Sequence, residues 1–119
     1  MGSERLLTME FGRVHPLYVA KAERKGRTRD EVDTIIRWMT GYAQADLEDL
    51  IDADVDLATF FAAAPALNPA REHITGKVCG VQVETIEDPT VREIRRLDKL
   101  VDELAKGRPM DRILRTVPA

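Results

Sequence analysis

Three side chains in this sequence are reactive enough for nucleophilic or general-base chemistry: Cys79, His15 and His73. A catalytic thiol requires a neighbouring imidazole and surroundings that lower its pKa. Cys79 lies between Val78 and Gly80 in an apolar segment, which favours a buried and unreactive thiol. The spacing of the three residues matches no Cys/His or Ser/His/Asp arrangement. The sequence therefore predicts no catalytic site and favours a protein that is not an enzyme.

Asp52, Asp54 and Asp56 have the spacing that opens a calcium-binding loop. An EF-hand loop also needs glycine at its sixth position and glutamate at its twelfth, and here those positions hold Leu57 and Ala63. The aspartates are better explained as the end of one helix and the N-cap of the next. The chain also lacks a CxxC pair, a paired-histidine motif and a glycine-rich phosphate loop. We therefore predict no metal and no cofactor.

A dense basic cluster lies at the end of the first predicted helix and in the turn after it, and consists of Lys21, Arg24, Lys25, Arg27 and Arg29. Two helices joined by a short turn are typical of helix-turn-helix DNA-binding proteins. The second helix, however, begins Asp30-Glu31-Val32-Asp33, and these carboxylates would repel phosphates. A solvated face is the favoured interpretation, and weak nucleic-acid contact through residues 21–29 stays open as an alternative.

The composition is that of a globular protein of one domain. The chain has 119 residues, of which 44% are hydrophobic and 33% charged, with a formal net charge of −3. We expect one helical domain over residues 1–119, with frayed ends at 1–5 and 116–119. A single cysteine cannot form an internal disulfide, which favours the cytoplasm. No apolar run approaches the ~18 residues of a membrane span, so no membrane association is predicted.

The clearest structural signal is the helix predicted over residues 28–40. Thr28 and Glu31 form a capping-box pattern, and apolar residues follow at positions 32, 35, 36 and 39. Gly41 is a natural left-handed terminator. Trp38 and Tyr42 lie on one shoulder of the apolar stripe, and the pattern leaves open whether that shoulder faces the core, a second subunit or a ligand.

The remaining patterns predict a mainly α fold of five or six helices, with a minor two-strand β element and an α+β class as the alternative. Helices are expected over 16–25, 44–52, 56–64 and 88–106, followed by a last turn from Pro109. Alternating residues predict strands at 7–11 and 78–86, although a helical turn opening at Thr8 is a rival for the first. The charged residues of the 88–106 helix are expected to form a solvated face.

Several long stretches together carry a family resemblance. They are residues 14–23, the Trp-Met-Thr-Gly-Tyr end of the 28–42 stretch, residues 60–65, and residues 76–112 with the segment Val-Cys-Gly-Val-Gln-Val-Glu-Thr-Ile-Glu-Asp-Pro. The chain resembles a bacterial family catalogued as domain of unknown function 2200. The resemblance covers nearly the whole chain and implies one cytoplasmic domain, but no activity. His15 departs from it where tyrosine is common, and Ala43 where a serine cap is common.

For function, the sequence favours a non-enzymatic interaction module that self-associates as a homodimer, because the 78–86 strand needs a pairing partner. That partner is either residues 6–11 or the same strand of a second copy. The alternative is a small-molecule-binding protein or enzyme with a site near the first helix. The candidate ligand or partner contacts are His15, Tyr18, Lys21, Trp38, Tyr42, Arg71 and Cys79.

Overall fold

The computed structural model describes residues 2–116, and its clearest helix is α3 (Arg29–Thr40). The Thr28 hydroxyl accepts a hydrogen bond from the Glu31 N–H at 3.1 Å, and the Glu31 carboxylate accepts one from the Thr28 N–H at 3.0 Å. Gly41 ends the helix with φ of 81°, a conformation that costs glycine little. The capping box and the terminator predicted from the sequence are both confirmed.

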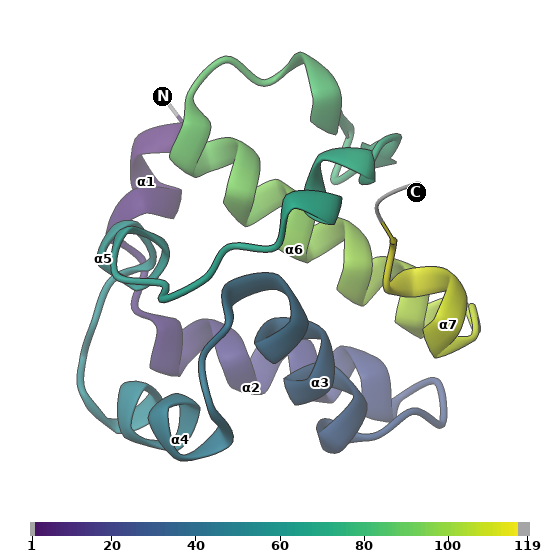
Figure 1. The fold of residues 1–119 in the computed structure, drawn as a ribbon, viewed down its shortest axis with the longest axis horizontal. Coiled ribbons are helices and arrows are strands. Elements are labelled where there is room, and N and C mark those ends of the chain that lie inside the picture. Colours follow the sequence, from purple (N-terminus) through teal and green to yellow (C-terminus); the bar gives the residue numbers. More distant parts are fainter. Residues whose placement is uncertain (1, 117–119) are drawn as a thin grey trace.

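The longest helix, α6 (Pro89–Ala105), crosses the molecule and contacts most of the other elements (Figure 1). Asp88 caps it, because its carboxylate accepts the N–H groups of Thr90 and Val91 at 2.9 and 3.1 Å. The apolar seam of α6 is buried as predicted, and consists of Val91, Ile94, Leu97, Leu100, Val101 and Leu104.

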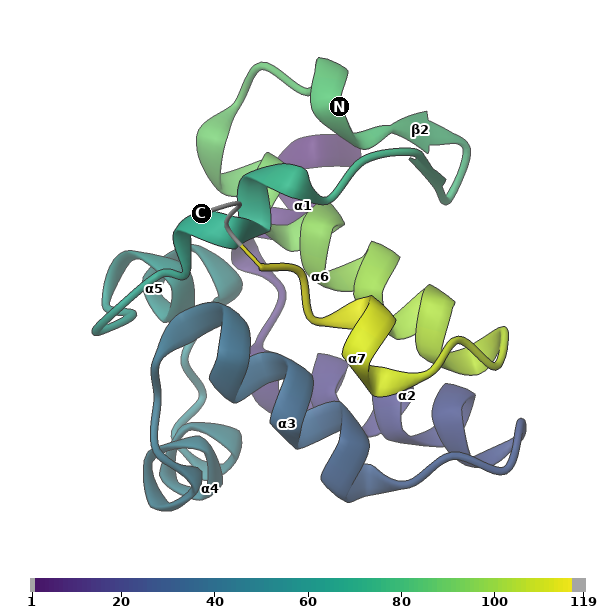
Figure 2. The same cartoon turned by 45° about the vertical axis from the view of Figure 1, so that its right-hand side comes forward.

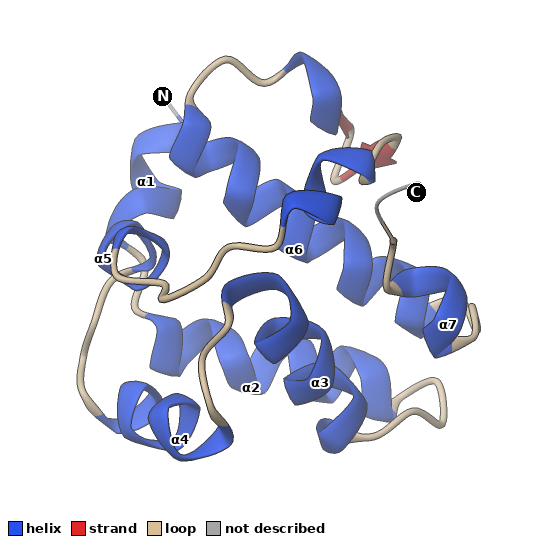
Figure 3. Ribbon diagram, in the orientation of Figure 1, coloured by secondary structure: helices blue, strands red, loops and turns tan. Residues whose placement is uncertain are grey.

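The described residues form seven α-helices, two short 3-10 helices and one small β hairpin (Figure 3), which confirms the mainly helical fold. The other α-helices are α1 (Gly2–Thr8), α2 (Phe11–Glu23), α4 (Gln44–Asp52), α5 (Leu57–Ala62) and α7 (Met110–Ile113). The 3-10 helices are η1 (Pro69–His73) and η2 (Val83–Thr85). None of the helices within residues 2–116 is both long and apolar enough to span a bilayer.

The strand predicted at residues 7–11 is wrong, and so is the rival helical turn opening at Thr8. Residues 2–8 form α1, while residues 1 and 117–119, on which the predicted frayed ends partly fall, lie outside the described part. The alternating pattern arises because α1 ends and α2 begins within it. Only a single antiparallel bridge remains, between Glu10 and Asp56.

The helix predicted to begin at Pro16 in fact begins at Phe11, so Pro16 lies inside α2. The proline removes one backbone donor, but Phe11 is completely buried, and its packing outweighs the local signal. Gly12 allows α4 to approach this helix, because a Cβ at residue 12 would lie only 2.1 Å from the Ile51 carbonyl oxygen.

The strand predicted over residues 78–86 is two short strands that pair with each other. β1 (Lys77–Val78) and β2 (Val81–Gln82) form an antiparallel hairpin, and η2 follows directly. The two halves of the predicted strand are therefore each other's pairing partners, and the predicted pairing with residues 6–11 is not found among the described residues. Figure 2 shows it at one end of the molecule, and β1 packs against α6.

One hydrophobic core joins all the α-helices that flank α6. Phe11 and Phe60 stack at its centre with ring centroids 4.1 Å apart, and the Tyr42 ring lies 5.0 Å from Phe60. The radius of gyration is 13.3 Å, close to the ~13.5 Å expected for a compact chain of this length.

The charged residues of α6 do not form the solvated face that was predicted. Glu93, Arg96 and Glu103 are buried, with 7%, 8% and 6% of their surface exposed. These buried charges are paired, because they bind one another or distant partners. Glu93, for example, accepts hydrogen bonds from Arg96 at 2.9 Å and from Arg71 at 2.7 Å. The isolated helix pattern could not reveal those partners.

Candidate functional site

A pocket of about 270 Å³ lies where α2, α6 and the turn of the β hairpin meet. We call it the thiol pocket, because the side chain of Cys79 forms part of its wall. Its lining residues are Leu17, Tyr18, Ala20, Lys21, Arg24, Cys79, Asp98 and Val101. The pocket thus combines a thiol, a phenol, a carboxylate and two cations with an apolar floor.

Cys79 occupies a backbone conformation that cysteine rarely adopts. It has φ of 51° and is followed by Gly80 with φ of 76°, and this pair of positive angles forms the two-residue turn between β1 and β2. Such turns favour asparagine, aspartate or glycine at the first position. For another L-residue the left-handed conformation costs about 1–2 kcal/mol. The turn itself therefore does not explain a cysteine here, and its thiol is free and exposed.

Tyr18 and Asp98 form a fixed hydrogen-bonded pair in the pocket wall. The Tyr18 hydroxyl donates to Asp98 Oδ1 at 2.5 Å, and Arg95 donates to Asp98 Oδ2 at 3.0 Å. Burial, together with the negative charge of Asp98, raises the pKa of Tyr18 well above its ordinary value. The phenol therefore keeps its proton at neutral pH and cannot act as a base.

Lys21 and Arg24 supply the positive charge of the pocket. Lys21 Nζ donates to Asp102 Oδ1 at 3.2 Å, and Lys106 Nζ lies 3.0 Å from the other oxygen of the same carboxylate. Burial alone would raise the pKa of Asp102, but the hydrogen bonds from Lys106 and Lys21 outweigh it and hold that pKa below its ordinary value. Arg24 is exposed and has no ion pair within residues 2–116, so its charge is available to a ligand.

This arrangement suits a small molecule with one acidic group. A carboxylate or a similar anion would be attracted to Lys21 and Arg24, while Leu17, Ala20 and Val101 would cover an apolar body. The thiol of Cys79 would then lie beside the ligand. Ligand pockets commonly have such apolar walls with a few converging polar groups.

Comparisons with known proteins place the chain in a family. The model of a family described as an uncharacterized protein conserved in bacteria, DUF2200, matches residues 5–115. The chain belongs to DUF2200. The resemblance expected from its motifs is therefore confirmed, although the family description gives no activity.

A solved structure supports the same fold. The crystal structure of the uncharacterized protein SP1917 is similar to this DUF2200 chain, with 46% sequence identity and a TM-score of 0.88. The match covers 93% of this chain and 91% of that one. A comparison with curated proteins returns no match.

Of the seven candidate contacts, Tyr18, Lys21 and Cys79 meet at the thiol pocket of this DUF2200 chain. His15 does not, because it is buried and its Nε2 lies 2.6 Å from Asp33 Oδ1 of α3. Arg71 is also elsewhere, bound to Glu93. The fold thus brings together three of the five residues predicted to converge near the first helix. The other two, His15 and Arg71, are bound to carboxylates in different parts of the fold.

The shoulder formed by Trp38 and Tyr42 faces the core. Tyr42 is buried, and its hydroxyl donates to the Phe60 carbonyl at 2.7 Å, while Trp38 is half-buried and packs against the same cluster. Burial raises the pKa of Tyr42, with a smaller contribution from Asp46. These two aromatic residues support the core and do not line the thiol pocket.

The sequence did not single out Asp98 and Asp102 as site residues. Asp98 and Asp102 are one helical turn apart on α6, and their partners Tyr18 and Lys21 are one helical turn apart on α2. This shared one-turn spacing is the sequence pattern from which the two aspartates could be predicted. The aspartates at 52, 54 and 56 behave as interpreted: Asp52 ends α4, and Asp56 caps α5 by accepting the Thr59 N–H at 2.7 Å.

Proposed function

We propose that this DUF2200 protein binds a small molecule in the thiol pocket, and that the ligand has an apolar body and one acidic group. The meeting of Tyr18, Lys21 and Cys79 around one pocket carries this proposal. The unusual turn conformation of Cys79 supports it, because strained residues tend to persist at functional sites.

We propose binding without catalysis. Neither His15 nor His73 lines the thiol pocket, so Cys79 lacks a neighbouring imidazole as general base. We also propose the cytoplasm as the compartment of the protein. The exposed, unpaired thiol supports this, because a reducing compartment keeps such a group reduced.

A thermal-shift screen of small carboxylic acids tests the binding proposal. A ligand that binds only the folded state raises the melting temperature. The variant Ala20→Leu places extra bulk in the pocket, and Ala45→Leu makes the same change at an exposed position of α4. We expect hits to stabilise the wild type and Ala45→Leu but not Ala20→Leu. Hits that stabilise all three equally would refute the site.

We propose self-association as a second candidate function, on evidence other than the hairpin. Among the residues whose burial the structure describes, Leu17 and Met9 are the large apolar side chains that remain exposed, at 62% and 37%. Both line an apolar groove of about 190 Å³, together with Leu6, Val14 and Ile94 among others. In a two-fold dimer, Leu17 of each copy would enter the groove of the other.

Sedimentation velocity of the wild type and Met9→Lys tests this second candidate. Met9 lines the groove but not the thiol pocket, so the substitution changes no lining residue of the thiol pocket. We expect a dimer for the wild type and a shift towards monomer for Met9→Lys. A wild type that stays monomeric at high concentration would exclude the dimer.

A further inference from the structure

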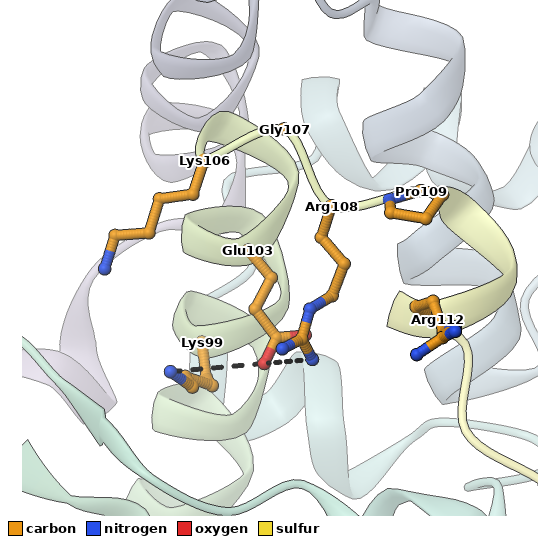
Figure 4. A pocket seen from close by; sticks show the side chains of 7 residues that line it. All are labelled: Lys99, Glu103, Lys106, Gly107, Arg108, Pro109 and Arg112. Atoms are coloured by element: carbon orange, nitrogen blue, oxygen red, sulfur yellow. Dashed lines mark ion pairs between the residues drawn. The ribbon is translucent and has the colours of Figure 1, made fainter.

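A second and larger pocket, of about 800 Å³, lies where α6 ends and the chain turns into α7 (Figure 4). We call it the basic pocket. Four cationic side chains and one carboxylate line it: Lys99, Lys106, Arg108, Arg112 and Glu103. It is distinct from the thiol pocket, with which it shares no lining residue.

Local chain geometry brings these cations together. Lys99, Glu103 and Lys106 lie on one face of α6 and its end, and Gly107, with φ of 90°, then reverses the chain. Arg108 follows at once and points back towards Glu103 (Figure 4). Arg27 holds the turn in place, because its guanidinium donates to the Arg108 carbonyl at 2.8 Å.

Glu103 cannot neutralise the pocket, because its carboxylate is already bound. Arg115 donates to both of its oxygens, at 2.6 and 2.8 Å. Arg108 and Lys99 lie farther away, at 3.5 and 4.0 Å, and reach the carboxylate from opposite sides (Figure 4). Arg112 is exposed and has no ion pair within residues 2–116. The pocket therefore keeps an excess of positive charge.

We propose that the basic pocket binds a phosphate-bearing small molecule. Arginine forks and lysine ammonium groups are the usual protein ligands of phosphate oxygens. The pocket volume lies within the ~300–1,000 Å³ of typical small-molecule sites. A bound phosphate would relieve the mutual repulsion of Lys99, Arg108 and Arg112.

A small ligand fits this pocket better than a nucleic-acid backbone. The cations are gathered in one hollow at the end of α6, and carboxylates alternate with them along the chain, with Asp102 bound to Lys106 and Asp111 next to Arg112 in the sequence. An extended backbone needs a continuous basic surface, which these carboxylates interrupt. In the neighbouring basic turn, moreover, Arg27 and Arg29 are already paired with Glu31 and Glu48.

Isothermal titration with inorganic pyrophosphate tests the proposal on the full chain at low salt. We expect Arg108→Gln and Arg112→Gln each to weaken binding about tenfold, because each removes a charge-assisted hydrogen bond. Arg13→Gln is the matched control: its side chain is 83% exposed and lies on α2, and this variant should bind as the wild type does. Circular dichroism of each variant confirms that the fold is intact.

Three outcomes would overturn the proposal. The first is the absence of any pyrophosphate binding by the folded wild type at low salt. The second is binding that Arg108→Gln and Arg112→Gln leave unchanged. The third is a single-stranded RNA oligonucleotide that displaces pyrophosphate and binds more tightly, which would assign the pocket to nucleic acid.

Discussion

The helices α3 and α6 both bury an apolar stripe, but they satisfy their polar groups differently. In α3 the Glu31 carboxylate binds Thr28 and Arg27, which are close to it in sequence. In α6, Asp98 and Asp102 bind side chains of α2 as well as Arg95 and Lys106, which are close to them in sequence. A helix satisfied locally supports the core, whereas α6 joins distant segments and forms one wall of both proposed sites.

The contrast has exceptions within α3, because Arg29 binds Glu48 of α4 at 2.9 Å and Asp33 also has distant partners. Asp33 is buried, and it binds His15 of α2 and the Gln44 side chain of α4. These contacts connect α3 to its neighbours but place no group in the thiol pocket or the basic pocket. Long-range polar contacts alone therefore do not make a site, and an adjoining pocket is the second requirement.

The largest effect is expected from the core stripe of α3. Ile36 is completely buried, so Ile36→Ala should lower the free energy of unfolding by about 2–5 kcal/mol, through lost burial and a residual cavity. Urea denaturation measures the change. A loss below about 1 kcal/mol would mean that α3 is not the core support described above.

A smaller effect is expected from the link between α2 and α6. Tyr18→Phe removes a hydrogen bond to the Asp98 carboxylate, and should cost about 1.5–3 kcal/mol. Tyr42→Phe is the comparison variant, because it removes a bond to a neutral carbonyl and should cost only about 1 kcal/mol. If the two variants lose the same free energy of unfolding, the bond to the Asp98 carboxylate is no stronger than the bond to the neutral carbonyl.

Tyr18→Phe should also change how the free energy of unfolding depends on alkaline pH. The pKa of Tyr18 is raised in the folded protein, whereas the unfolded side chain loses its proton near pH ~10. The stabilisation is therefore present below that pH and is lost as the pH rises above it. Denaturation across this range should show a shallower loss for Tyr18→Phe, though not a flat profile, because Tyr42 acts in the same direction.

The local cap of α3 should have a smaller effect again. Thr28→Ala removes the capping-box hydroxyl and should cost about 1 kcal/mol. Thr8→Ala at the end of α1 is the control, since its exposed hydroxyl bonds only within its own helix, and should change stability by less than about 0.5 kcal/mol. If Thr28→Ala behaves like this control, α3 does not depend on its local start signal.

The smallest effect is a gain in stability at the hairpin turn. Cys79→Asn should stabilise the protein by about 0.5–1 kcal/mol, because asparagine tolerates the left-handed conformation. Cys79→Ser keeps the unfavourable turn geometry and should give no gain. A gain in both variants would attribute the effect to the loss of the thiol rather than to the backbone.

The sequence predicts well what depends on neighbouring residues. The start and end of α3, the bounds of α4, the cap at Asp56 and the start of α6 all follow from short-range patterns, and all are confirmed. It fails where tertiary packing decides, as at Pro16, whose signal for a helix start is overridden by burial of the preceding turn.

The candidate site was predictable only in part for the same reason. Tyr18, Lys21 and Cys79 were singled out by their residue types and their segments. The charge pattern of α6 predicts a solvated face for Asp98 and Asp102, because nothing within α6 indicates which of its charged residues face α2. The same pattern fails to predict the burial of Glu103, since its partner Arg115 lies beyond the turn that follows α6.

The rate at which charged and neutral reagents alkylate Cys79 tests most directly whether the thiol pocket attracts anions. Iodoacetate and iodoacetamide alkylate cysteine alike but differ in charge, and the single cysteine makes intact mass a clean readout. We predict that the iodoacetate-to-iodoacetamide rate ratio at Cys79 is higher in the folded protein than in urea, and that Arg24→Gln lowers it while Arg13→Gln does not. A ratio that is the same in the folded protein, in urea and in Arg24→Gln would contradict an anion-binding thiol pocket.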